Sequence, residues 1–177
     1  MIKKLLPLLV IAVILIMGSC NSTIYFTQEM RNNLNENRLE LEDVQFYVSR
    51  KLVLKRNLTY DETKIARGEI KFENGQYVEE IVIPKNTHGI ALDKGGNWIN
   101  VAFEQGVNRD LKFVMNSESL YQITALDWND NYGKIKYDTL YYYLDPGGDE
   151  ALLKVKKEEI YNFQKKKRVV KGRTVGR

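Results

Sequence analysis

The chain has 177 residues and a formal net charge of +4, and its composition is 44% hydrophobic and 28% charged. These values are typical of a single globular domain with a buried core, and they exclude an intrinsically disordered chain. One cysteine and one histidine exclude a disulfide scaffold, a cysteine-based zinc site and most histidine-ligated metal centres, so we expect no cofactor.

The N-terminal segment has the order of a bacterial export signal. Lys3 and Lys4 precede a run of thirteen residues without charge, Leu5 to Met17. A helix that spans a bilayer needs roughly 18–20 apolar residues, so this run is too short for a transmembrane helix and suits the hydrophobic region of a signal peptide.

The next residues complete a recognisable motif. Met17-Gly18-Ser19-Cys20 resembles the lipobox of bacterial lipoproteins. The resemblance implies that residues 1–19 are a signal peptide and that Cys20 becomes the first mature residue, acylated with fatty acids such as palmitate. Several acyl chains, at about 0.8 kcal/mol per buried methylene, anchor a protein stably where one would be marginal. A plain secretory signal and an uncleaved anchor helix are the alternatives.

The residues after Cys20 bear on the destination of the protein. Asn21-Ser22-Thr23 contains no aspartate and starts no acidic run. By analogy with lipoprotein sorting signals, this favours the outer membrane, facing the periplasm. Residues 20–26 would form a lipidated tether, which reaches no further than about 20 Å from the lipid. The whole chain is similar to small β-rich lipoproteins of Gram-negative envelopes, a resemblance that names no family for the mature domain.

The mature chain begins with one short helix and continues as strands. Thr27 is a suitable N-cap for a helix from Gln28 to about Asn37. From Leu41 the pattern changes to a period of two, and the apolar residues Val44, Phe46, Val48, Leu52 and Leu54 point one way, which predicts a long strand. Arg50 interrupts this apolar series and predicts a bulge or bend there.

Asn74-Gly75 predicts a β-hairpin with a two-residue turn, in which Phe72 faces Tyr77. Branched and aromatic runs between short turns predict further strands at 81–83, 98–103, 111–115, 120–128, 134–137, 140–144 and 152–155. This pattern predicts a mainly β domain over residues 27–157, an antiparallel barrel or sandwich with a short N-terminal helix and a basic C-terminal tail.

Charge is distributed unevenly along the chain. Residues 154–177 hold ten Lys or Arg and two Glu, whereas residues 21–153 hold 15 basic and 21 acidic residues. The run Lys165, Lys166, Lys167 and Arg168 is too dense in like charge to be buried, so we expect a basic tail over residues 158–177. The tail is either without function or a site for an anionic partner: lipid headgroups, acidic cell-wall polymer or an acidic protein face. An exported lipoprotein does not meet nucleic acid.

Candidates for catalysis and metal binding are weak. His88 lies in a polar turn, and the chain has no Gly-x-Ser-x-Gly motif. Aspartates near turns could pair for glycan cleavage, but turn aspartates commonly bond the local backbone. They are Asp127, Asp130, Asp138, Asp145 and Asp149. Residues 127–131 lack the glycine and distal glutamate of a calcium loop. We expect no catalytic residue and no metal site.

Aromatic residues are the remaining candidates. In a strand, Tyr141 and Tyr143 share one face and Tyr142 takes the other, so at least one face should be partly exposed. These tyrosines and Trp98 can pack across strands or stack on a sugar or a partner.

The sequence favours a non-enzymatic, lipid-anchored envelope protein that binds another outer-membrane or periplasmic component, as a subunit of a membrane protein complex. A barrel that carries a lipid or other hydrophobic ligand is the alternative, and a cell-wall glycan hydrolase is the third hypothesis. An apolar cavity would favour the carrier, and a filled core with an exposed apolar patch would favour the binding protein. A cleft with converging acids would favour the hydrolase.

Overall fold

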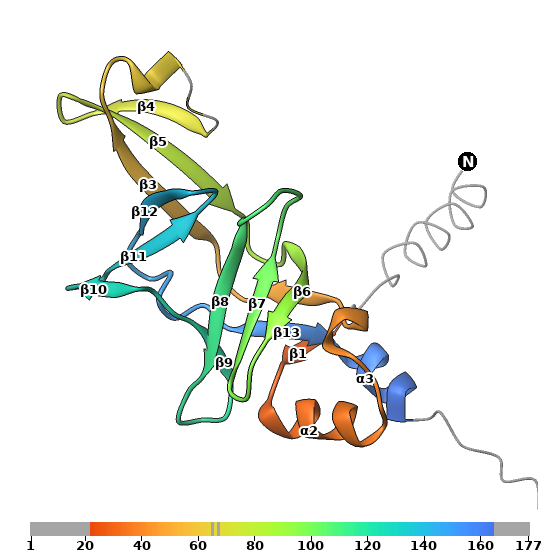
Figure 1. Ribbon diagram of the computed structural model, residues 1–177. Coiled ribbons are helices and arrows are strands. Elements are labelled where there is room, and N and C mark those ends of the chain that lie inside the picture. Colours follow the sequence, from red (N-terminus) through yellow and green to blue (C-terminus); the bar gives the residue numbers. More distant parts are fainter. Residues whose placement is uncertain (1–21, 65, 67, 165–177) are drawn as a thin grey trace, which may run out of the picture.

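The computed structural model describes residues 22–64, 66 and 68–164 (Figure 1). Its strands form two antiparallel sheets, which confirms the prediction of a mainly β, antiparallel domain. Apolar side chains from both sheets meet in one buried cluster that includes Phe46, Leu54, Phe113 and Leu144. The chain passes between the two sheets more than once.

The first sheet, which we call the body sheet, has seven strands in the order β1-β13-β2-β6-β7-β8-β9. They are β1 (Thr23–Tyr25), β13 (Leu153–Lys156), β2 (Phe46–Val48), β6 (His88–Lys94), β7 (Trp98–Ala102), β8 (Asp110–Met115) and β9 (Tyr121–Ile123). At its outer strand β9 the sheet meets its first two strands only through two isolated bridges, Gln122–Leu152 next to β13 and Leu120–Thr27 after β1. Two isolated bridges do not make a continuous ladder, so among the described residues the sheet is not a closed barrel and the barrel form of the prediction is wrong.

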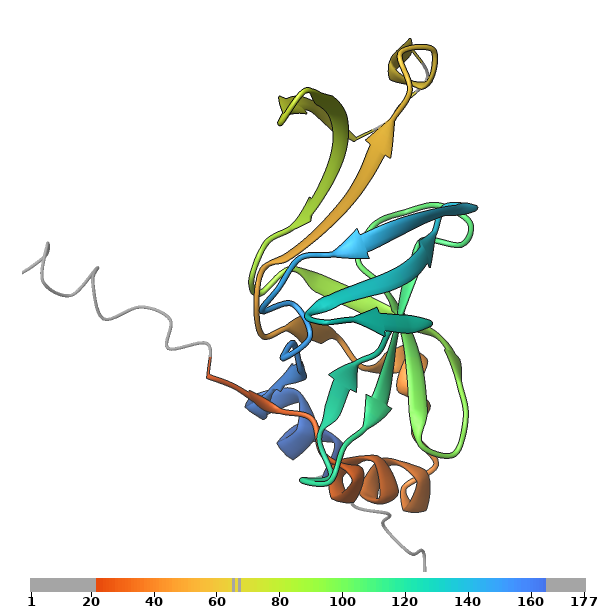
Figure 2. The ribbon, with the colours of Figure 1, turned by 90° about the vertical axis from the view of Figure 1, so that its left-hand side faces the viewer.

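The second sheet has six strands in the order β10-β11-β12-β3-β5-β4. They are β10 (Asp127–Asn129), β11 (Tyr132–Tyr137), β12 (Leu140–Leu144), β3 (Leu52–Leu58), β5 (Gln76–Ile83) and β4 (Glu69–Glu73). β12 pairs with β3 only at Tyr143–Lys55 and Leu144–Leu54. Beyond this point β3, β5 and β4 leave the body as a three-stranded extension, which Figures 1 and 2 show projecting from the rest of the protein. We call residues 56–80 the arm.

The predicted long strand from Leu41 is divided among three elements. A single 3-10 turn, η1 (Leu41–Asp43), precedes β2, and Ser49–Lys51 then carries the chain from the body sheet to β3 in the second sheet. The predicted strand at 120–128 likewise divides into β9 and β10, one in each sheet. The predicted bend at Arg50 lies at the first of these changes and is present as a bend at residues 49–50, but the pattern of apolar residues does not show that the chain moves to another sheet.

The folded domain begins earlier than the predicted tether allows. Thr23–Tyr25 pair with β13, and Phe26 is fully buried. The Phe26 ring lies 5.1 Å from that of Phe46 and 5.5 Å from that of Tyr121, measured between ring centroids. The segment from Thr23 to Phe26 therefore belongs to the body, because its backbone completes the sheet and its aromatic ring completes the core.

The predicted N-terminal helix is present as α2 (Gln28–Glu36), and the backbone N–H of Met30 donates to the Thr27 hydroxyl as expected for an N-cap (3.2 Å). A second helix, α3 (Lys157–Gln164), occupies the start of the predicted basic tail, and its Ile160 is buried against the core. Lys165, Lys166, Lys167 and Arg168 lie outside the described residues, as does Cys20. Among the described helices, none has the length and apolar character needed to cross a membrane.

The predicted hairpin at Asn74-Gly75 is confirmed. Both residues have positive φ (49° and 81°), and Phe72 pairs with Tyr77. A side chain at Gly75 would meet no atom within 4 Å, so a substitution there tests backbone conformation alone.

Gly75→Val should lower the free energy of unfolding by about 1–2 kcal/mol, because a β-branched residue resists positive φ. Gly96→Val is the matched control, since its surroundings are equally open and its φ lies outside the left-handed region. Denaturant unfolding of both variants provides the measurement. Equal losses in the two variants would contradict the turn conformation.

Candidate functional site

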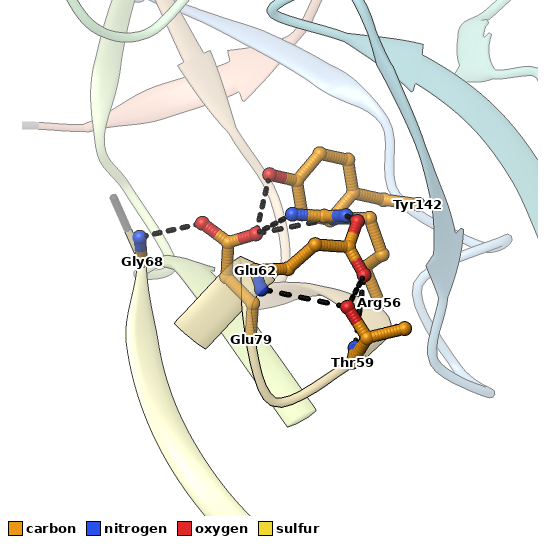
Figure 3. Close-up of polar contacts among 6 residues, drawn as sticks. All are labelled: Arg56, Thr59, Glu62, Gly68, Glu79 and Tyr142. Atoms are coloured by element: carbon orange, nitrogen blue, oxygen red, sulfur yellow. Dashed lines mark hydrogen bonds and ion pairs between the residues drawn. The ribbon is translucent and has the colours of Figure 1, made fainter. Parts of the chain in front are cut away.

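The base of the arm is held by an ion pair between two neighbouring strands (Figure 3). Arg56 of β3 lies opposite Glu79 of β5, and its Nε and Nη2 donate to Glu79 Oε2 at 3.2 and 2.9 Å. The Glu79 side chain is 1% exposed and that of Arg56 is 14% exposed. A buried carboxylate needs such donors, because its desolvation otherwise costs several kcal/mol.

Tyr142 joins this pair to the body at the place where the backbone ladder between β3 and β12 ends. Its hydroxyl donates to Glu79 Oε2 (3.0 Å), and the Arg56 guanidinium lies 5.8 Å from its ring centroid. The N–H of Gly68 donates to the other oxygen of Glu79 (2.8 Å). Burial, together with the negative charge of Glu79, raises the pKa of Tyr142 to about 12. Tyr142 therefore remains a protonated donor at neutral pH.

The connection between β3 and β4 is attached to the same arginine. It contains the 3-10 turn η2 (Glu62–Lys64), and Glu62 accepts hydrogen bonds from the backbone N–H and hydroxyl of Thr59 (2.8 and 2.9 Å). Arg56 Nη1 also donates to Glu62 (2.7 Å). The Thr59 N–H, the Thr59 hydroxyl and Arg56, in this order of effect, lower the pKa of Glu62 to about 2. We call Arg56, Thr59, Glu62, Gly68, Glu79 and Tyr142 the Glu79 cluster.

A second polar cluster lies in the body, on the other side of the split between the arm and β12. Arg109 pairs with Asp138 (3.0 Å) and Glu104 (3.4 Å), and the Tyr137 hydroxyl donates to Glu104 (2.8 Å). Burial and the negative charge of Glu104 raise the pKa of Tyr137. These contacts fix the β11–β12 turn, where Asp138 and Thr139 both have positive φ.

Residues of both clusters line one hollow of about 480 Å³, which is also lined by Ile81, Val82 and Leu140. Arg56 uses all three of its nitrogens to donate to Glu79 and Glu62. Arg109 directs both terminal nitrogens to Asp138 and to the Gln105 carbonyl. Because the guanidinium groups are engaged within the protein, this hollow is suited to holding the arm in place rather than to binding an anion.

The exposed part of the arm has a different character. Phe72 and Tyr77 are 66% and 37% exposed and their ring centroids lie 5.1 Å apart. Tyr60 is 68% exposed and lies 6.5 Å from Tyr77, and Ile70 is 39% exposed. We call Tyr60, Ile70, Phe72 and Tyr77 the aromatic tip. Four large apolar side chains that gather at one projecting end form an apolar surface patch, in contrast to apolar residues scattered singly.

The tyrosines that the sequence analysis singled out alternate as predicted. Tyr142 is buried, whereas Tyr141 and Tyr143 are 49% and 46% exposed on the opposite face of the sheet. Lys134 Nζ lies 4.7 Å from the Tyr141 ring centroid. Trp98, on β7, is partly buried and has Lys112 Nζ at 4.7 Å from its ring. These contacts are cross-strand packing of a cation on an aromatic ring.

Four of the five turn aspartates have local or structural partners. Asp145 pairs with Lys55 (3.0 Å), Asp127 accepts from the N–H of Trp128 (2.9 Å), and Asp149 accepts from the N–H of Gly147 (3.0 Å). Asp138 pairs with Arg109 as described, and Asp130 has a positive φ of 51° in its turn. No cluster of these or other His, Cys, Asp or Glu side chains in the described part of the chain could hold a metal ion.

His88 opens strand β6 instead of lying in a turn. It is exposed and lies opposite Tyr47 in the sheet. The strand itself, His88–Lys94, is missed by the sequence analysis.

The Glu79 cluster and the aromatic tip are also missed by the sequence analysis, although two signals point to them. Thr59 and Glu62 have the Thr-x-x-Glu spacing of a capping box. Counting back along the hairpin from the pairing of Phe72 with Tyr77 places Ile70 opposite Glu79. These side chains therefore share one face of the hairpin, which a reader of the sequence could have derived. Comparisons of this chain with protein-family models, with curated proteins and with solved structures found no match.

Proposed function

We propose that this protein is a non-enzymatic, lipid-anchored envelope protein that binds another outer-membrane or periplasmic protein through the aromatic tip of the arm. The exposed aromatic tip is the observation that carries the proposal. Tyr and Phe are enriched at protein interfaces, where they contribute much of the binding energy, and a contiguous apolar patch of this kind is costly to leave in water.

The position of the arm supports the proposal. Only Asn21 and Ser22 separate the expected lipid-bearing residue Cys20 from β1. Figures 1 and 2 place β1 in the body and the arm at the far end of the protein. A body anchored next to the membrane would present the aromatic tip away from its own anchor. Lys165, Lys166, Lys167 and Arg168 would add contacts with an anionic partner or with lipid headgroups.

The alternative functions find less support in the site. A carrier needs an apolar cavity, but the largest apolar side chains pack against one another in the core, and charged residues line the hollow beside the arm. A glycan hydrolase needs an acid and a base whose carboxylates can reach the substrate. In the hollow, Glu79 and Asp138 accept hydrogen bonds from Arg56 and Arg109.

Cys20→Ala should abolish lipidation, because it removes the only thiol that can carry the diacylglycerol. The variant should leave the membrane fraction and lose labelling by an alkyne analogue of palmitate. Ser22→Ala is the control, since it changes a neighbouring residue and keeps the lipobox. Equal labelling of the wild type and Cys20→Ala would overturn the lipid anchor.

A photo-crosslinking residue, p-benzoylphenylalanine, in place of Phe72 should give a discrete adduct with an envelope protein in solubilised membranes. The same residue in place of Val107, which is 79% exposed on the body, is the control. Mass spectrometry of the adducts identifies the partner. Adducts that are the same at both positions, or absent at Phe72, would contradict binding through the aromatic tip.

A further inference from the structure

We propose that β4 is a receptor strand: it binds an extended segment of the partner protein by adding it as a further antiparallel strand, and it selects a segment in which charged and apolar residues alternate, with basic residues at both ends and an acidic residue in the middle. This inference rests on the proposed function and specifies how the arm would bind. Its basis is the free edge of β4 together with the arrangement of charge along it.

The backbone of β4 is open on one side. β4 is the last strand of its sheet, with β5 on one edge and no strand of the described residues on the other. Glu73 and Gln76 close a two-residue hairpin, so their backbone groups exchange hydrogen bonds. In an antiparallel ladder every second pair does the same, so Lys71 bonds with Val78 and Glu69 bonds with Glu80. The alternation directs the N–H and C=O groups of Ile70 and Phe72 away from β5. These two residues can receive a new strand.

The side chains of β4 determine which residues the added strand of the partner should contain. Ile70 and Phe72 lie on the face of the aromatic tip and require apolar residues opposite them. Glu69, Lys71 and Glu73 lie on the other face. Lys71 is already bound to Glu80, which leaves acidic Glu69 and Glu73 at the two ends. Lys55 approaches Glu73 only to 4.0 Å and lies closer to Asp145.

The matching segment therefore has the order basic, apolar, acidic, apolar, basic. A second copy of β4 does not fit this description. In the register that pairs all five residues of two antiparallel β4 strands, Glu69 faces Glu73, Lys71 faces Lys71, and Glu73 faces Glu69. Like charges directly opposite one another destabilise a strand pair. The same charges that favour a basic partner thus oppose full edge-to-edge pairing between copies of this chain.

Two peptides test the charge selection on the full lipidated chain in detergent micelles. The first is Thr-Lys-Val-Glu-Val-Lys-Thr, and the second, Thr-Glu-Val-Lys-Val-Glu-Thr, inverts every charge. The wild type should bind the first more tightly by about tenfold, as measured by fluorescence anisotropy. The double variant Glu69→Lys, Glu73→Lys should reverse that preference. The absence of any preference in the wild type would overturn the proposal.

Ile70→Pro tests the backbone. It removes an N–H that points away from β5, so the β4–β5 ladder remains, and proline is tolerated on edge strands. It should weaken binding of the first peptide by about tenfold or more, whereas Ile70→Val, which keeps the N–H, should bind like the wild type. Equal binding by the two variants would overturn strand addition. If Ile70→Pro no longer binds the peptide but the partner still crosslinks at position 72, the partner contacts the aromatic tip without adding a strand. If no adduct forms at position 72 in the otherwise wild-type chain, the proposed function itself is refuted.

Discussion

Glu79→Ala should lower the free energy of unfolding of the arm by about 3–5 kcal/mol, because it leaves the largely buried Arg56 guanidinium without its main carboxylate. The Tyr142 hydroxyl and the Gly68 N–H lose their acceptor in the same change. Amide hydrogen exchange in β3 and β5, together with urea unfolding, separates opening of the arm from unfolding of the body.

Glu80→Ala is the matched control, since Glu80 follows Glu79 in the same strand and points to the other face of the sheet. The Glu80 side chain is 8% exposed, but its partner Lys71 is 39% exposed and can be solvated once Glu80 is removed, so the change leaves no buried charge unpaired and should cost less than Glu79→Ala, about 1 kcal/mol. The double variant Arg56→Met, Glu79→Leu should be more stable than Glu79→Leu alone, because a buried ion pair can be replaced by apolar side chains when both partners change together. Equal effects of Glu79→Ala and Glu80→Ala would show that the Glu79 cluster does not hold the arm.

The parts of the fold that could be predicted are those whose cause is local. Asn74-Gly75 is such a case, because the turn chemistry and the flanking alternation lie within a few residues of one another. The change of sheet at Ser49–Lys51 has only a partial local signal: Arg50 interrupts the apolar series and predicts the bend, but Val48 and Leu52 are both fully buried on either side of it. The alternation of apolar residues identifies a buried face but not the sheet to which that face belongs.

Strand β6 was missed for a different reason. Its inward residues are Gly89 and Ala91, whereas Ile90 and Leu92 point outward and are 50% and 49% exposed. Its apolar alternation is therefore inverted relative to the rule that large apolar residues face the core. Only the neighbouring strands reveal that small residues are needed there, because a side chain on Gly89 would come within 2.7 Å of the Ala102 carbonyl oxygen.

The candidate site was less predictable than the fold, because its members come from distant parts of the chain. Arg56 and Tyr142 are 86 positions apart, and they meet only because β12 and β3 pair for two residues and then diverge. The aromatic tip could not be recognised from composition either. Phe72 and Tyr77 have the same character as core residues, and the projection of the arm alone makes them exposed.

Phe26→Ala should be among the most destabilising substitutions in the body, with a loss of about 3–5 kcal/mol in the free energy of unfolding. The ring is fully buried and contacts two further aromatic rings, those of Phe46 and Tyr121, so its removal leaves a cavity that rigid neighbours cannot fill. Denaturant unfolding of the unlipidated chain provides the measurement.

Tyr25→Ala is the control for Phe26→Ala, because Tyr25 is the adjacent residue and is 49% exposed; it should cost about 1 kcal/mol or less. The comparison separates a segment that is part of the core from a tether that only links the core to a lipid, since in a tether both substitutions would be equally mild. If the large difference is found, the link between the acylated Cys20 and the body shortens to Asn21 and Ser22. Three residues reach no further than about 10 Å, so the body would lie against the lipid surface and leave the arm to extend toward a partner.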